Sequence, residues 1–342
     1  MQKHTAYYYY LSVTSTANIP MKFPTLLILS TALIMNSPQI HAAPSAQESI
    51  RHPALLPQAQ EWLYQSKTNS KTYRIQTIAV GKQPASGYPV LYLLDGDAYF
   101  PMAAAVAQGL EMRAQENHAT PLLIVAVGYP GGKIFDNASR AEDYTPPSTS
   151  YAQTGDGTNK KFGGAEAFWR FLHTELQPQI TREFGGNSKK QTLFGHSYGG
   201  LFGLYVLFNH TETFQNYLIA SPSFWWNQQR ILQDLPAFLA KQRQAQSPVN
   251  VRLSVGEYEQ TLAPHLNGAR ERQTILQNRR MVDHLLQTGK RFAALPKEAM
   301  RVETVVYPKE THSASAFSAL ADGIKQIFVY NADLNPDSAK AE

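Results

Sequence analysis

The chain has 342 residues, of which 43% are hydrophobic and 11% aromatic, enough apolar side chain to fill a sizeable core. Its formal net charge of +5 is small, and the sequence contains no dense run of Lys and Arg. We therefore expect no nucleic-acid partner. The absence of cysteine excludes disulfides, thiolate metal ligands and a cysteine nucleophile.

Residues 1–43 have the features of a targeting segment. Met21 and Lys22 open a short positive region, an apolar run follows over 26–35, and Ala42 and Ala43 are small residues of the kind that a signal peptidase recognises. The run is short for a membrane span, and no cysteine follows it for lipid attachment. We therefore expect a start at Met21, a cleaved signal peptide, no stable membrane anchor, and a periplasmic or secreted product. A buried N-terminal helix is the alternative.

Short apolar runs alternate with amphipathic segments over 44–335, a rhythm typical of a mostly parallel sheet flanked by helices. We expect strands over 73–80, 90–94, 122–127, 191–194, 216–220, 251–255 and 302–307, and helices over 165–184, 200–208 and 270–287. No repeat or linker divides this region, so we predict one α/β domain over 44–335 and a polar tail over 336–342. The polar stretch 135–162 predicts a long loop over the carboxyl edge of the sheet.

One pentapeptide, Gly195-His196-Ser197-Tyr198-Gly199, carries the clearest chemical signal. It follows a predicted strand and precedes a predicted helix, which is the context of the G-x-S-x-G nucleophile elbow. The sharp turn strains the serine backbone, and the glycines are needed because a Cβ would collide across the turn. We predict an α/β-hydrolase fold with Ser197 as nucleophile.

A serine hydroxyl needs a general base, and usually an acid that orients the base. In this fold the order along the chain is Ser, then Asp or Glu, then His. Of the four histidines after Ser197, His312 follows the last predicted strand and is the predicted base. Glu257, directly after the strand 251–255, is the predicted acid. Glu259 is nearly as well placed, and a Ser-His dyad without an acid stays open.

Two backbone N–H groups are expected to stabilise the developing oxyanion. Tyr198, the residue after the nucleophile, supplies one, and Asp97 after the strand 90–94 is the candidate for the other. Asp95 and Asp97 are alternatively a metal pair. Because no His or carboxylate cluster accompanies them in the sequence, we predict no metal site and no cofactor.

Three strings together carry a family resemblance: Pro89 to Asp97 (PVLYLLDGD), the elbow with Gly200, and Ser221 to Trp226 (SPSFWW). They resemble the "putative esterase" (esterase D-like) family of α/β-hydrolases, and within it the periplasmic and cytoplasmic esterases that cleave trilactone catecholate siderophores. The resemblance covers about residues 50 to 330. It implies hydrolysis of a carboxylic ester through an acyl-enzyme, and some siderophore-cleaving members are described as Ser-His dyads.

The resemblance also implies substrate-binding residues. Arg140 matches a family segment whose arginine contacts anionic substrate, as a planar fork of donors can, and a surface salt bridge to Glu142 or Asp143 is the alternative. Trp225 and Trp226 resemble paired tryptophans near the family's site. We expect one of them to line the pocket and the other to pack in the core, with core packing of both as the alternative.

The predicted partner is a small-molecule ester, and an anionic ferric siderophore is among the candidates. The first hypothesis is a serine esterase acting on siderophore-type or aromatic esters. The second is a broad-specificity carboxylesterase or acyltransferase of the same family, because mycolyl-transferring relatives share the elbow. The third is a catalytically inactive binding protein on a hydrolase scaffold, against which the retention of Ser197 and His312 argues.

Overall fold

The computed structural model of the chain describes residues 56–117, 119–266 and 268–329. The predicted signal peptide, the start at Met21 and the polar tail over 336–342 lie outside these ranges. Within them, no helix is long and apolar enough to cross a membrane.

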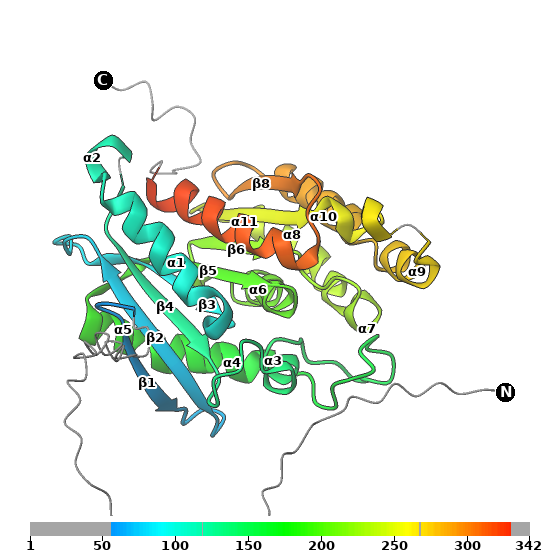
Figure 1. Ribbon diagram of the computed structural model, residues 1–342, viewed down its shortest axis with the longest axis horizontal. Coiled ribbons are helices and arrows are strands. Elements are labelled where there is room, and N and C mark those ends of the chain that lie inside the picture. Colours follow the sequence, from blue (N-terminus) through cyan, green and yellow to red (C-terminus); the bar gives the residue numbers. More distant parts are fainter. Residues whose placement is uncertain (1–55, 118, 267, 330–342) are drawn as a thin grey trace, which may run out of the picture. The chain divides into compact units, whose positions relative to one another are not determined.

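An eight-stranded sheet in the order β1-β2-β4-β3-β5-β6-β7-β8 forms the framework (Figure 1). β1 pairs antiparallel with β2 and β2 antiparallel with β4, and the remaining pairs are parallel. β4 is buried along its whole length, as expected of a central strand covered by helices on both faces. The strands are β1 (Gln60–Gln65), β2 (Thr72–Val80), β3 (Tyr88–Leu94), β4 (Leu122–Gly128), β5 (Gly186–His196), β6 (Asn216–Ala220), β7 (Val249–Gly256) and β8 (Met300–Tyr307).

Helices cover both faces of this sheet. α1 and α11 pack on one face, and α3 to α6, α8 and α10 pack on the other, as Figure 1 shows. The described α-helices are α1 (Gly96–Glu111), α2 (Ala114–Asn117), α3 (Asn137–Asp143), α4 (Ala165–Phe171), α5 (Gln177–Phe184), α6 (Tyr198–Asn209), α7 (Trp226–Gln229), α8 (Leu235–Gln242), α9 (Arg270–Arg279), α10 (Met281–Ala293) and α11 (His312–Ile324).

The predicted α/β-hydrolase fold is confirmed, and each of the seven predicted strands is present. Three details differ. The predicted helix over 270–287 is wrong at Arg280, whose left-handed φ of 45° separates α9 from α10. The predicted loop over 135–162 contains α3, which Asp136 caps by accepting a hydrogen bond from the backbone N–H of Ser139 at 3.0 Å. A helix that is not among the predicted ones, α1, directly follows β3.

The parallel register brings the carboxyl ends of β3 and β5 to β8 to the same edge of the sheet. Leu93 pairs with both Ala126 and Phe194, so β3, β4 and β5 end at the same level. Ligands of open α/β sheets bind at such an edge. The segments that leave these strands therefore define where the site must lie.

Candidate active site

Ser197 stands at the turn from β5 into α6, as the elbow pattern predicts. Its φ of 61° and ψ of −115° lie outside the regions that side chains favour, and its backbone N–H donates to the carbonyl of Ala220 at 3.0 Å. A Cβ on Gly195 would lie 2.2 Å from the carbonyl oxygen of Gly199. Only glycine therefore fits at the position before His196, and the tight turn lifts the serine side chain off the sheet.

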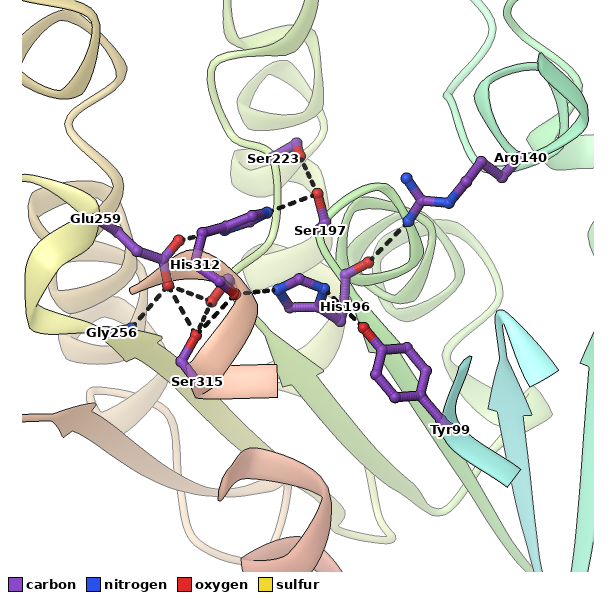
Figure 2. A network of polar contacts seen from close by, with 10 residues as sticks. Tyr99, Arg140, His196, Ser197, Ser223, Gly256, Glu259, His312 and Ser315 are labelled. Atoms are coloured by element: carbon purple, nitrogen blue, oxygen red, sulfur yellow. Dashed lines mark hydrogen bonds and ion pairs between the residues drawn. The ribbon is translucent and has the colours of Figure 1, made fainter. Parts of the chain in front are cut away.

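His312, the first residue of α11, reaches the nucleophile from the far end of the chain (Figure 2). Its Nε2 lies 3.0 Å from Ser197 Oγ, and its Nδ1 lies 2.5 Å from Glu259 Oε2. The carboxylate can only accept, so Nδ1 carries a hydrogen and Nε2 is free to accept the serine proton. This is the geometry of a nucleophile, its base and an orienting acid.

The prediction of Glu257 as the acid is wrong, because the structure places Glu259 against the imidazole. β7 ends at Gly256, and residues 257–259 then form a 3-10 turn that points these two side chains in different directions. Glu257 is exposed and accepts from the backbone N–H of Lys309 at 2.7 Å, whereas Glu259 is buried. A Cβ on Gly256 would lie 2.4 Å from the carbonyl oxygen of Glu310, so glycine lets the loop that carries His312 come close.

Three donors hold the other oxygen of Glu259. Oε1 accepts from Ser221 Oγ at 2.5 Å, from Ser315 Oγ at 3.0 Å and from the backbone N–H of Gly256 at 2.8 Å. Burial alone would raise the pKa of Glu259, but the hydrogen bonds from His312, Ser221 and Gly256 outweigh it and hold that pKa below its ordinary value. The carboxylate is therefore ionised and fixed in place.

His196 is a buried member of the site that sequence reasoning did not single out. Its Nε2 lies 2.8 Å from the carbonyl oxygen of His312 and its Nδ1 lies 3.0 Å from Tyr99 Oη. Burial lowers the pKa of His196 well below its usual range, and the nearby His312 and Arg140 act in the same direction. A neutral ring beside a carbonyl must donate from Nε2, so Nδ1 accepts from Tyr99. The x position of the G-x-S-x-G pattern is the only sequence signal that could have pointed to it.

The two predicted oxyanion donors lie in the first turns of helices. Tyr198 begins α6 and Asp97 lies in the first turn of α1, where backbone N–H groups lack intrahelical acceptors. The side chain of Asp97 forms an ion pair with Arg74, and that of Asp95 pairs with Arg140, which argues against a metal pair. The oxyanion role of both N–H groups stays a prediction.

Beside Ser197 lies a pocket of about 390 Å³, lined by residues that include Arg140, Tyr198, Trp225 and Arg279. Arg140 is buried and donates to both oxygens of Asp95, at 2.8 and 2.9 Å, rather than to the two neighbouring carboxylates considered above. Its guanidinium also lies over the ring of Tyr198, 5.6 Å from its centroid. It thus faces the pocket, and its contact with substrate stays a prediction.

The two tryptophans separate as expected. Trp225 lines the pocket, with its ring 6.0 Å from that of Tyr198. Trp226 is fully buried and packs against Tyr151 and Phe162. A substrate-binding role for Trp226 is therefore wrong, because its indole does not reach the pocket surface.

No group of three or more His, Asp or Glu side chains within the described ranges is arranged to hold a metal ion.

Ser223 Oγ lies 3.4 Å from Ser197 Oγ and adds a second hydroxyl beside the nucleophile. The residues brought together are thus a serine, an imidazole base, an ionised carboxylate and the first turns of two helices. Such an arrangement performs acyl transfer to and from serine.

Fold and site together define an α/β-hydrolase of the carboxylic ester hydrolase class. A family model described as "Putative esterase" matches residues 72–322, which is most of the chain, and the chain belongs to this family.

Named relatives are similar along most of their length. The chain is 31% identical over 261 residues to the ferri-bacillibactin esterase BesA of Bacillus subtilis (strain 168), a match that covers 75% of this chain and 85% of that protein. It is 34% identical over 249 residues to the siderophore enterobactin esterase of Emericella nidulans, covering 68% and 80%. The crystal structure of the BES protein from Bacillus cereus superposes with a TM-score of 0.71 at 30% identity, covering 83% of this chain and 99% of that one.

Proposed function

We propose that the chain hydrolyses carboxylic esters through an acyl-enzyme formed on Ser197. The observation that carries this proposal is the unbroken series from Glu259 through His312 to Ser197, with contacts of 2.5 and 3.0 Å. His312 Nε2 takes the hydroxyl proton while Oγ attacks the ester carbonyl, and the carbonyl electrons move onto oxygen. The N–H groups of Tyr198 and Asp97 are the candidates for stabilising that oxyanion.

Collapse of the tetrahedral intermediate breaks the bond to the leaving alcohol, which takes the proton from His312. Water then attacks the acyl-enzyme, again giving its proton to His312, and the acid product leaves as Ser197 regains its hydrogen. Glu259 stays ionised throughout and stabilises the imidazolium that forms in each half of the reaction.

As substrate we propose a siderophore ester of the trilactone type or a related aromatic ester, including an anionic ferric form. The relatives named above are esterases of bacillibactin and enterobactin by name, and the pocket combines aromatic walls with arginine side chains. Aromatic rings suit an aryl acyl group, and guanidinium groups suit its anionic oxygens.

A panel of esters tests this proposal. The purified protein is assayed on p-nitrophenyl esters of rising chain length, on a feruloyl ester, and on a catecholate trilactone with and without iron. We expect turnover, highest kcat/KM on the trilactone, and loss of all turnover in Ser197→Ala. Turnover that survives in Ser197→Ala, or none on any ester by folded protein, would overturn the proposal.

We further propose export to the periplasm or the medium, supported by the signal-like sequence over 21–43. The N-terminal sequence of the protein recovered from the producing cells tests this. A mature chain that begins near Pro44 is expected, whereas an intact N-terminus on protein found only in the cytoplasm would contradict it.

A further inference from the structure

Arg279, the last residue of α9, lies on the wall of the pocket beside Ser197. Its guanidinium stacks over the indole of Trp225, with Cζ 4.1 Å from the ring centroid. The side chain is half-buried, whereas Arg272 on the same helix is exposed. Arg279 therefore belongs to the pocket, although no sequence pattern predicted it as a site residue.

No carboxylate among the described residues forms an ion pair with Arg279, whereas Arg140 on the same pocket is paired with Asp95. Asp156 also lines the pocket, but it accepts from Tyr198 Oη at 2.7 Å and from the backbone and side chain of Asn159. The carboxylate of Asp156 is thus already hydrogen-bonded to other donors.

This environment compensates the positive charge of Arg279 only in part. Burial lowers the pKa of Arg279 and the charge of Arg272 adds to the effect, while Tyr198 and Asp156 oppose it only in part. A partly desolvated charge without a partner is unfavourable. An anion that entered the pocket would relieve that cost.

The chemistry of the guanidinium indicates what kind of anion fits. The group is planar and carries five N–H donors in a fixed fork, and its position over the indole leaves donors available to a ligand in the pocket. Such a fork matches two oxygens held in one plane, as in a carboxylate or a catecholate. Arg140 presents a second guanidinium to the same pocket of about 390 Å³.

We propose that Arg279, held over the ring of Trp225, is a specificity-determining residue that binds a planar anionic group on the acyl part of the ester. The inference rests on the proposed esterase function, since it assigns the acyl group to this pocket. It makes the enzyme selective for charge: an anionic ester is preferred over a neutral ester of the same length because of a residue on α9.

A matched pair of esters tests the charge selectivity. p-Nitrophenyl butyrate and mono-p-nitrophenyl succinate have acyl groups of equal length, and only the second is anionic. In Arg279→Gln we expect kcat/KM on the succinate ester to fall about tenfold or more, as loss of a hydrogen bond to a charged group implies. The value on the butyrate ester should stay within about twofold, and Arg279→Lys should retain part of the preference.

Arg272→Gln is the control variant, because it removes one positive charge from the exposed side of the same helix. It should leave the ratio of the two kcat/KM values unchanged. Equal losses on both esters in Arg279→Gln would show a structural role only, and unchanged values on both would show no role. Either result overturns the inference.

A binding measurement separates this inference from the esterase function. The probe is the anionic iron(III) complex of a tripodal tris-catecholate ligand with amide in place of ester links. It is titrated into the protein, and its binding is measured by the change in tryptophan fluorescence. We expect Arg279→Gln to raise its Kd about tenfold and Arg272→Gln to leave it unchanged. If the protein hydrolyses no ester, the proposed function fails, and this titration alone decides the inference: an unchanged Kd in Arg279→Gln overturns it.

Discussion

Glu257 and Glu259 both follow the end of β7, but they have different contacts. Glu259 is 2% exposed and contacts the imidazole, while Glu257 is exposed and holds a backbone N–H of the loop before His312. The two residues offer a matched test of which one is the catalytic acid. Substituting either one removes a single carboxylate from the same short turn.

We expect Glu259→Gln to lower kcat/KM by about 10² to 10⁴, because an amide can donate to Nδ1 and favour the wrong imidazole tautomer. Glu257→Gln should stay within about threefold of wild type. Steady-state kinetics on one p-nitrophenyl ester measures both. Equal losses would contradict the assignment, and no loss in either would indicate a Ser-His dyad.

His196 contacts both the backbone and the side chain of the base, since the centroids of the two imidazole rings lie 4.5 Å apart. Because its Nε2 donates to the carbonyl of His312, the ring helps to hold the first turn of α11 against the elbow, as Figure 2 shows. Its two ring nitrogens are engaged by Tyr99 Oη and by the carbonyl of His312 rather than by the reacting atoms, so its role is to position His312.

His196→Ala should therefore lower kcat about tenfold with little change in KM, and reduce the free energy of unfolding by about 1–3 kcal/mol, since it leaves the buried hydroxyl of Tyr99 without this partner and removes one of the donors to the carbonyl of His312. His196→Gln retains a donor near the Nε2 position and should recover much of kcat. Kinetics and urea unfolding of the same preparations check this. Recovery of stability without recovery of kcat in the glutamine variant would refute a positioning role.

The elbow is the element on which the site depends most directly. A Cβ at Gly195 would lie 2.2 Å from the carbonyl oxygen of Gly199, whereas a Cβ at Gly109 in α1 meets nothing within 4 Å. The position of Gly195 thus requires glycine and that of Gly109 does not, although both lie within regular elements.

Gly195→Ala should destabilise the protein by more than about 4 kcal/mol, or prevent folding, because backbone must move to admit the methyl group. Gly109→Ala should raise the free energy of unfolding by up to about 1 kcal/mol through helix propensity. Thermal and urea unfolding give both values. A Gly195→Ala protein as stable and active as wild type would show that the turn is looser than described.

Sequence reasoning succeeded where a local pattern determines the structure. The buried strands read as apolar runs, and Gly195 to Gly199 between strand and helix located Ser197. It failed where tertiary packing decides. The 3-10 turn after β7 turns Glu259 inward, the left-handed Arg280 ends α9 early, and the stacking of Arg279 on Trp225 joins segments 54 residues apart. No periodicity records these contacts.

At the scale of the whole molecule, buried titratable groups make stability depend on pH. Burial lowers the pKa of His196, and of His284, below the ordinary 6.5. The unfolded chain therefore binds more protons than the folded chain as pH falls through 6.5, and stability is lost there. Burial opposes ionisation of Asp156, Glu166 and Glu259, but hydrogen bonds outweigh it and lower the pKa of each. Their stabilisation is present above the ordinary carboxyl pKa and is lost at more acid pH.

Asp143 contributes to the pH dependence of stability with the opposite sign. Burial raises the pKa of Asp143 despite the nearby Lys71, so this group favours the folded state more as pH falls. We expect the sum to be a free energy of unfolding that decreases from about pH 7 to pH 5 and decreases further below about pH 4.5.

Urea unfolding at a series of pH values measures this dependence. His196→Gln should flatten the decrease between about pH 7 and pH 5, and Glu259→Gln should flatten it below about pH 4.5. A wild-type stability that rises as the pH falls from 7 to 5 would contradict the neutral, buried state of His196.

The most direct test of the catalytic series is covalent labelling with a fluorophosphonate, followed by mass spectrometry of the intact and digested protein. We expect one adduct per chain on the peptide that contains Ser197, none in Ser197→Ala, and labelling slowed by about a hundredfold or more in His312→Ala. Folded wild-type protein that takes up no label, or takes it up on another residue, would contradict the account.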